Sequence, residues 1–160
     1  MTKLNGYGKG GCMMNCIIRA MIESDKECVL AMMRVFYNSS AILSNGSDEI
    51  FNSDIENCVG KCPYVEGYIF QNESVVQGYA MVAKSFSTEF GTPCIWVEDL
   101  YIKPEYRGQG ISSRFFSYIE KQYPDTLLRL EVERDNEKAI QVYKKCGYDE
   151  LPYMEMKKDN

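Results

Sequence analysis

A strand that runs directly into a glycine-containing loop and an amphipathic helix is the feature that most constrains this chain. Residues 94–102 read CIWVEDLYI, the loop KPEYRGQG follows, and Ile111, Phe115 and Ile119 recur at helical spacing until Pro124. The first amides of a helix lack internal partners and carry partial positive charge. The segment therefore predicts a strand–loop–helix unit that can bind an anion, although two glycines before a helix also occur in ordinary turns.

The loop matches neither of the two best-known phosphate-binding patterns. It lacks the G-x-x-x-x-G-K-[ST] sequence, and although Gly108 and Gly110 fit G-x-G-x-x-G, serine stands at position 113. Glycines would still let the backbone approach a phosphate closely. Arg107, with Lys103 or Arg114 nearby, could add charge-assisted hydrogen bonds.

Hydrophobic periodicity and turn residues predict the order of the remaining elements. Ser24 and Glu27 have the spacing of a capping box, Ser47 or Asp48 opens a second helix, and Asn136 can cap a last helix that Gly147 ends. In order, we expect a strand (16–20), two helices, an antiparallel meander (64–70, 75–84, 94–102), a helix, a strand (126–133), a helix with a buried stripe, and a final strand (153–157).

Composition and the absence of histidine exclude several function classes. A net charge of −5 argues against a general nucleic-acid binder, and no stretch is long and apolar enough for a membrane helix. Without histidine, Ser-His and Cys-His nucleophiles and His-liganded metals are excluded. Two C-x3-C pairs, Cys12/Cys16 and Cys58/Cys62, leave a zinc site open, but we interpret the cysteines as reduced thiols of a cytoplasmic protein.

Two motifs in register resemble the GNAT superfamily of N-acetyltransferases. Residues 103–112, KPEYRGQGIS, resemble its acetyl-coenzyme A signature [Arg/Gln]-x-x-Gly-x-[Gly/Ala], with Arg107 and Gly110 matching and Ser112 departing from the pattern. Downstream, Asn136, Tyr143 and the Gly-Tyr pair at 147–148 resemble a second family segment, Asn-x-x-Ala-x-x-x-Tyr-x-x-x-Gly-[Phe/Tyr]. The resemblance is clear over residues 64–157.

The resemblance implies an α/β (α+β) fold: a single domain with a mixed, mostly antiparallel central sheet of about six to seven strands flanked by about four helices. We expect residues 1–14 to be a flexible leader and residues 15–160 to form the acetyl-CoA-binding domain. The resemblance also implies that the third strand of the meander (residues 94–102) splays from its neighbour, so that the backbone of this strand can contact the coenzyme.

Acetyl-CoA is the implied co-substrate, with no metal. The resemblance implies that the coenzyme is bound by strand, loop and helix positions, namely Leu100, Tyr101, Ile102, Arg107, Gly108, Gln109, Gly110, Ile111, Ser112, Asn136 and Tyr143. Tyr143 would donate to the leaving sulfur, and a backbone amide at residues 100–102 would stabilise the oxyanion. From the residues alone, a core tyrosine on an apolar helical stripe is the favoured interpretation of Tyr143, and a plain helix cap is an equally good interpretation of Asn136.

The reaction requires a base other than histidine. An alkylammonium with a pKa of about 10.4 must lose a proton before it attacks, which costs about 4.6 kcal/mol at pH 7. Glu98 is the leading candidate base, Asp99 is its competitor, and the third alternative is that neither acts. In an extended strand the two side chains would point to opposite faces, so only one could reach the cleft.

We therefore expect an enzyme that moves the acetyl group of acetyl-CoA to a primary amine of a small molecule by direct attack in a ternary complex. Protein or peptide acetylation and a non-catalytic acyl-CoA-binding module are the alternatives. We expect no nucleic-acid or membrane partner, and a homodimer is compatible with these features.

Overall fold

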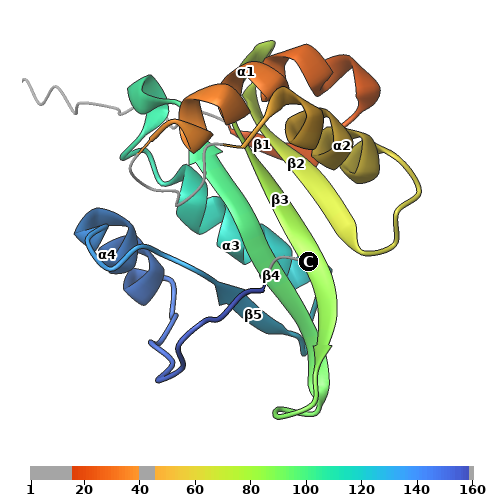
Figure 1. Cartoon of the computed structure of the whole chain (residues 1–160). Coiled ribbons are helices and arrows are strands. Elements are labelled where there is room, and N and C mark those ends of the chain that lie inside the picture. The colour runs from red at the N-terminus through yellow and green to blue at the C-terminus, as the bar shows by residue number, and fades with distance from the viewer. Residues whose placement is uncertain (1–15, 40–45, 159–160) are drawn as a thin grey trace, which may run out of the picture.

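The computed structural model describes residues 16–39 and 46–158, which form a mixed α/β fold (Figure 1). In chain order the elements are β1 (Ile17–Ala20), the 3-10 turn η1 (Glu23–Asp25), α1 (Lys26–Tyr37), α2 (Asp48–Val59), β2 (Val65–Asn72), β3 (Val75–Ser87), β4 (Thr92–Ile102), the 3-10 turn η2 (Pro104–Tyr106), α3 (Ile111–Gln122), β5 (Leu127–Leu130) and α4 (Glu137–Lys145).

The strands form one sheet in the order β1-β2-β3-β4-β5. The first four strands are antiparallel, as the predicted meander requires, and β5 joins β4 in parallel after the α3 crossover. Chain neighbours are thus also sheet neighbours, which leaves β1 and β5 at the two edges.

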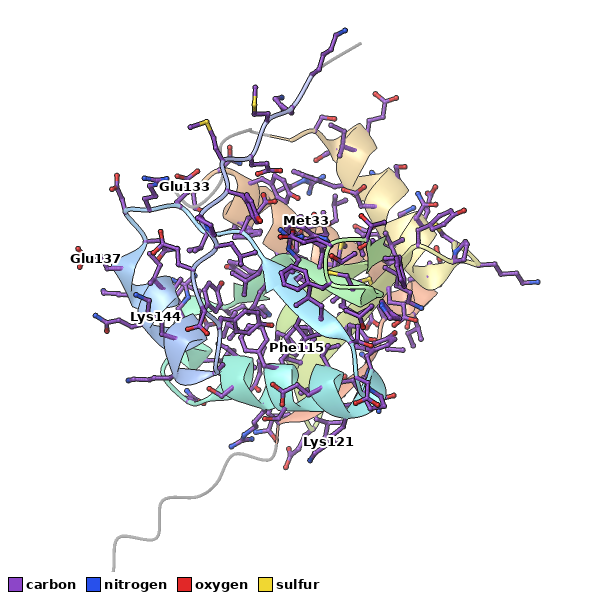
Figure 2. All side chains as sticks on the ribbon, turned by 90° about the horizontal axis from the view of Figure 1, so that it is seen from below. Met33, Phe115, Lys121, Glu133, Glu137 and Lys144 are labelled. Atoms are coloured by element: carbon purple, nitrogen blue, oxygen red, sulfur yellow. The ribbon has the colours of Figure 1, made fainter. Side chains whose placement is uncertain are left out.

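Two hydrophobic cores lie on opposite faces of this sheet. One contains α1 and α2 with Tyr79 and Tyr101 from the sheet, and the other contains α3 with Phe70 and Val97. Figure 2 labels one residue of each core, Met33 from α1 and Phe115 from α3, and both are fully buried. These side chains belong to the apolar stripes that predicted the helices.

The predicted strand count was too high, because the described residues form a sheet of five strands. The alternating pattern at residues 153–157 does not form a strand, and β5 ends at Leu130 instead of continuing to residue 133. A strand needs a hydrogen-bonded neighbour as well as an alternating pattern. Within the described residues this segment joins no ladder; the Tyr153 hydroxyl donates to Glu89 (2.6 Å), and Met154 and Met156 are exposed.

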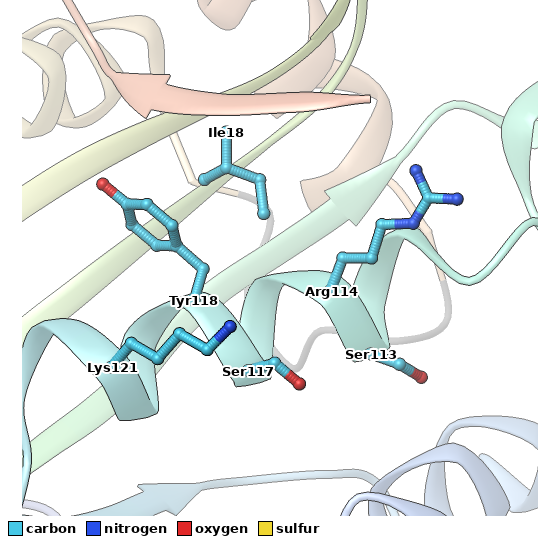
Figure 3. A pocket seen from close by; sticks show the side chains of 6 residues that line it. All are labelled: Ile18, Ser113, Arg114, Ser117, Tyr118 and Lys121. Carbon is cyan, nitrogen blue, oxygen red and sulfur yellow. The ribbon is translucent and has the colours of Figure 1, made fainter. Parts of the chain in front are cut away.

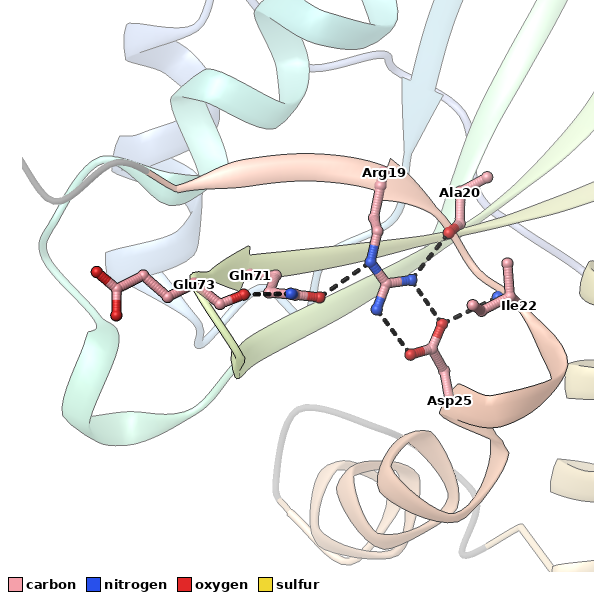
Figure 4. Close-up of polar contacts among 6 residues, drawn as sticks. All are labelled: Arg19, Ala20, Ile22, Asp25, Gln71 and Glu73. Carbon is pink, nitrogen blue, oxygen red and sulfur yellow. Dashed lines mark hydrogen bonds and ion pairs between the residues drawn. The ribbon is translucent and has the colours of Figure 1, made fainter.

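The start of α1 also differs from the prediction. The expected Ser24–Glu27 capping box does not form; instead Asp25 accepts a hydrogen bond from the Ile22 amide (2.9 Å). Arg19 binds both oxygens of this carboxylate (2.7 and 2.8 Å) and donates to Gln71 (2.9 Å), as Figure 4 shows. This network, whose guanidinium holds the pKa of Asp25 below its usual value, ties β1, β2 and α1 together.

Other sequence predictions for the helix ends were confirmed. Ser47 caps α2 by accepting from the Ile50 amide (3.3 Å), and Asn136 caps α4 by accepting from the Ala139 amide (3.3 Å). Residues 1–14, predicted to be a leader, lie outside the described residues, as does Cys12. Of the helices that the structure describes, none has the length and apolar character needed to cross a membrane.

Candidate active site

The parting of β4 from β5 defines the candidate site. Residues 94–97 of β4 pair with β5, but the pairing stops at Val97 and Leu130, whereas β4 continues along β3 to Ile102. In a strand, alternate backbone groups point to either side. On the side away from β3, β4 therefore pairs with no described strand beyond Val97, and the Ile102 carbonyl on that side accepts a hydrogen bond from the Arg107 Nε (2.9 Å).

A β-bulge stands where the two strands part. Asp99 pairs with Met81 and Val97 pairs with Val82, so Glu98 is an extra residue without a partner on β3. A bulge breaks the alternation of side chains and redirects the residues next to it. The expected arrangement, with Glu98 and Asp99 on opposite faces of a regular strand, is therefore replaced by an irregular one.

Asp99 is buried between two tyrosines. Its side chain is 4% exposed, one carboxylate oxygen accepts from the Tyr37 hydroxyl (3.0 Å), and the other accepts from Tyr79 (2.8 Å). Burial raises the pKa of Asp99 to about 6, against the opposing effect of the two hydrogen bonds. Because both oxygens are already bonded, Asp99 is poorly placed to meet a substrate directly.

Glu98 has a different environment. Its side chain reaches solvent, yet its pKa is raised, first because protein atoms displace part of its hydration and second because Glu155 repels its charge. Burial and a hydrogen bond with Glu155 also raise the pKa of Glu131, which follows β5 directly. Three carboxylates from β4, the end of β5 and the C-terminal segment thus lie close together.

Sequence reasoning missed Glu131, Glu155 and Tyr37. Glu131 and Glu155 lie in the two segments predicted to be strands at residues 126–133 and 153–157, and neither was predicted to be part of a site. Only the tertiary structure brings these residues together, and no local pattern in the sequence would have indicated it.

The loop before α3 has the backbone geometry of an anion site. Gly108 and Gly110 have φ angles of 73° and 77°, in the left-handed region that favours glycine. Gly110 is the N-cap residue of α3, no side chain caps this end, and the first helical bond runs from the Arg114 amide to the Gly110 carbonyl (3.1 Å). The amides of Ile111, Ser112 and Ser113 are therefore left for a ligand.

Arg107 is held beside this loop. Its Nε donates to the Ile102 carbonyl (2.9 Å), and its guanidinium lies 5.9 Å from the centre of the Tyr101 ring. Gln109 donates to the Glu105 carbonyl (3.2 Å) and stabilises the loop itself. A fixed cation beside uncapped amides fits the pyrophosphate of a nucleotide coenzyme.

α4 contributes Tyr143, which packs against the core under α3. The Tyr143 ring packs edge-on against Phe116, with centroids 5.8 Å apart, and lies 6.1 Å from Tyr148. Burial raises the pKa of Tyr143, and within the described residues its hydroxyl makes no hydrogen bond. The stripe predicted to be buried is only half buried, because no residue of α4 is fully enclosed.

A separate pocket of about 420 Å³ lies between β1 and α3 (Figure 3). It is lined by Ile18, Ser113, Arg114, Ser117, Tyr118 and Lys121. Because β1 and β5 are opposite edges of the sheet, this pocket is not part of the site between β4 and β5. Across residues 16–39 and 46–158, no group of three or more Cys, Asp or Glu side chains is placed to bind a metal.

Comparison with known proteins identifies the fold that carries this site. A model of the acetyltransferase (GNAT) family matches residues 30–148. The chain belongs to this family. As a GNAT protein it is an acetyl-CoA-dependent N-acetyltransferase by class, and the fold expected from the two motifs was confirmed apart from the number of strands.

Two named acetyltransferases match this chain at moderate sequence identity. A thialysine N-epsilon-acetyltransferase of Sus scrofa is 32% identical over 149 residues, which cover 87% of each protein. The Bos taurus protein of the same name is 40% identical over 79 residues, 48% of this chain and 46% of that protein. The chain thus aligns with about half the length of the bovine relative.

Solved structures share the fold at low identity. A possible acetyltransferase from Clostridium difficile 630 has a TM-score of 0.77 and 17% identity, over 91% of this chain and 97% of that one. An aminoglycoside N-acetyltransferase in complex with CoA has a TM-score of 0.74 and 13% identity, over 90% and 94%.

Proposed function

We propose that this protein transfers the acetyl group of acetyl-CoA to a primary amine of a small cationic molecule, by direct attack within a ternary complex. The observation that carries the proposal is the parting of β4 and β5 at the bulge. It exposes strand backbone between an uncapped helix N-terminus and a group of carboxylates. One side suits the coenzyme and the other suits an amine.

The coenzyme would be bound by backbone groups and one arginine. The amides at Ile111 and Ser112, with Arg107, would bind the pyrophosphate, and Gly108 and Gly110 would keep the loop open for it. Gln109 would maintain the loop, Asn136 would contact the coenzyme near its helix cap, and the β4 backbone at residues 100–102 would run beside the pantetheine.

Glu98 is the proposed base. It leaves the strand ladder at the bulge, reaches solvent, and has a raised pKa, so it can accept the proton that the ammonium group must lose. Asp99 is the weaker candidate, because Tyr37 and Tyr79 occupy both of its oxygens. The amine nitrogen then attacks the thioester carbon, and the C–S bond breaks as the tetrahedral intermediate collapses.

Tyr143 is the proposed donor to the leaving sulfur. A phenol whose pKa is raised by burial keeps its proton near neutrality, and this hydroxyl has no described partner that would compete for it. A free β4 amide at residues 100–102 would stabilise the oxyanion that develops on the thioester carbonyl.

The carboxylates favour a positively charged acceptor. Burial and repulsion by Glu155 raise the pKa of Glu98. Burial, a hydrogen bond with Glu155 and repulsion by Glu155 and Glu98 raise the pKa of Glu131, and a bound cation would relieve the repulsion. The names of the relatives, which refer to thialysine and to aminoglycosides, fit the same class of substrate. Peptide acetylation and a non-catalytic role are the outcomes that the experiment below must separate from this proposal.

The test measures release of free coenzyme A thiol from acetyl-CoA with amino acids, aminoglycosides, polyamines, arylalkylamines and peptides as acceptors. We expect turnover with a small cationic amine. Turnover with peptides alone would refute the proposed acceptor class, and coenzyme binding without any turnover would support a non-catalytic module.

The matched pair Tyr143→Phe and Tyr148→Phe tests the acid. Both tyrosines belong to the same aromatic cluster on Phe116. We expect Tyr143→Phe to lower kcat at least tenfold, equivalent to about 1.4 kcal/mol in the barrier, with little change in coenzyme affinity. Tyr148→Phe should keep most of the activity. Equal activity of the two variants would remove the assigned role of Tyr143.

A further inference from the structure

Asp54 is a charged residue on the inward face of α2. Residues three, four and seven apart share one face of a helix. Asp54 is three residues from Phe51 (4% exposed) and four from the half-buried Cys58, and therefore lies on the same face as these two inward-facing residues. Its own side chain is half buried, and burial raises its pKa. A carboxylate in such a position is costly unless a partner compensates its charge.

The protein provides no such partner within the part of the chain that the structure describes. Asp54 accepts no hydrogen bond and forms no ion pair there. Two other acids of the same helix do have cationic partners: Asp48 binds Arg34 (2.6 Å) and Glu56 binds Lys26 (2.8 Å). Asp54, the acid on the inward face of this helix, thus has no cationic partner among the described residues.

The surroundings of Asp54 lead to the candidate active site. The Tyr37 ring packs against Phe51, one turn from Asp54, with centroids 4.8 Å apart, and the Tyr37 hydroxyl donates to Asp99 next to the bulge. The charge of Asp54 contributes to the raised pKa of Tyr37, of Asp99 and of Cys58, so its carboxylate lies near all three. It therefore lies on the α1/α2 side of β4.

We propose that Asp54 is a specificity-determining residue that binds a second cationic group of the acceptor, separate from the amine that is acetylated. This inference rests on the proposed function and names a feature of its substrate. The reacting amine must become neutral before it attacks, so it needs a proton acceptor, whereas a second ammonium group remains charged and needs a fixed counter-charge. Glu98 on β4 would accept the proton of the reacting amine, and Asp54 on α2 would provide the counter-charge for the second ammonium group.

The experiment compares cadaverine with pentylamine, which lacks the second ammonium group. Binding of each amine to the protein with coenzyme A is measured by calorimetry for the wild type, for Asp54→Asn and for the control Asp48→Asn. We expect the wild type and the control to bind cadaverine at least tenfold more tightly than pentylamine. Asp54→Asn should lose most of this preference while binding pentylamine unchanged.

Stability provides a second readout. If Asp54 were only a structural residue, Asp54→Asn would lower the Tm and weaken the binding of both amines together. We expect its Tm to be equal or higher, because the substitution removes an uncompensated, half-buried charge. An unchanged preference for cadaverine in Asp54→Asn would overturn the inference. Asp54-dependent binding without turnover would instead support the inference and refute the proposed transfer.

Discussion

The buried carboxylate of Asp99 provides a quantitative test of the structure. Its pKa rises from an ordinary value of 3.8 to about 6 because the side chain is buried. The folded protein therefore holds this proton to a higher pH than the unfolded chain does. Ionisation of Asp99 destabilises the fold, and this penalty develops as the pH rises from about 4 and is complete above about 6.

The expected size follows from the same pKa. At 1.36 kcal/mol for each pH unit, the rise corresponds to a penalty of about 3 kcal/mol near pH 7. Asp99→Asn cannot ionise, so it escapes this penalty. Its amide oxygen can still accept from one tyrosine, while its NH₂ group donates to the other hydroxyl after that hydroxyl rotates.

The assay is urea unfolding of the wild type and Asp99→Asn between about pH 4 and pH 8, followed by the fluorescence of Trp96, the single tryptophan. The difference in unfolding free energy between the two proteins cancels the titration of the groups whose charges do not interact with Asp99. We expect the variant to gain up to about 3 kcal/mol relative to the wild type between pH 4 and pH 7.

A flat difference across this range would refute the reasoning, because Asp99 would then not titrate between pH 4 and pH 7 in the folded protein. Tyr37→Phe gives an independent check. It removes one hydrogen bond to the carboxylate, a bond that lowers the pKa of Asp99, so the transition should move to higher pH. A move to lower pH would contradict the assigned network.

Two further predictions concern the coenzyme side. Gly110→Ala places alanine at a left-handed φ of 77° and should cost about 1 kcal/mol of stability, as should the control Gly91→Ala in the β3–β4 turn, where φ is 63°. Only Gly110→Ala should weaken coenzyme A binding in a calorimetric titration; equal weakening by both would argue against the anion site. Asn136→Ala should lose about 1 kcal/mol with its cap, whereas Asn136→Asp should retain the cap. If Asn136→Asp keeps full coenzyme affinity, Asn136 acts only as a helix cap, and its side-chain NH₂ group donates no hydrogen bond to the coenzyme.

Local patterns in the sequence were sufficient to predict most of the fold. Helix stripes, the Ser47 and Asn136 caps and the meander depend on residues close together in the chain, and they were found where expected. The segment at residues 153–157 shows the limit of such patterns. Alternation indicates that a strand is compatible with the residues, but the ladder depends on whether a neighbouring edge is available.

The candidate site was less predictable because its carboxylates come from distant elements. The loop glycines and the helix cap are local features, and the sequence indicated them. The grouping of Glu131 and Glu155 with Glu98 depends on where β5 ends, and the isolation of Asp54 depends on which helix face meets the sheet. Spacing in the sequence carries no information on contacts of this kind.

The bulge explains how two adjacent acids acquire different properties. Ile95 and Val97 belong to the core under α3, so a regular strand would place residue 99 there as well. The inserted residue reverses this alternation, and Asp99 faces Tyr79 and Tyr37 on the α1/α2 side instead. Glu98, the inserted residue, is left outside the ladder with access to solvent. One extra residue in β4 thus buries the Asp99 carboxylate between two tyrosines and places the Glu98 carboxylate where β4 and β5 part. A regular strand would not give the two adjacent acids these different environments.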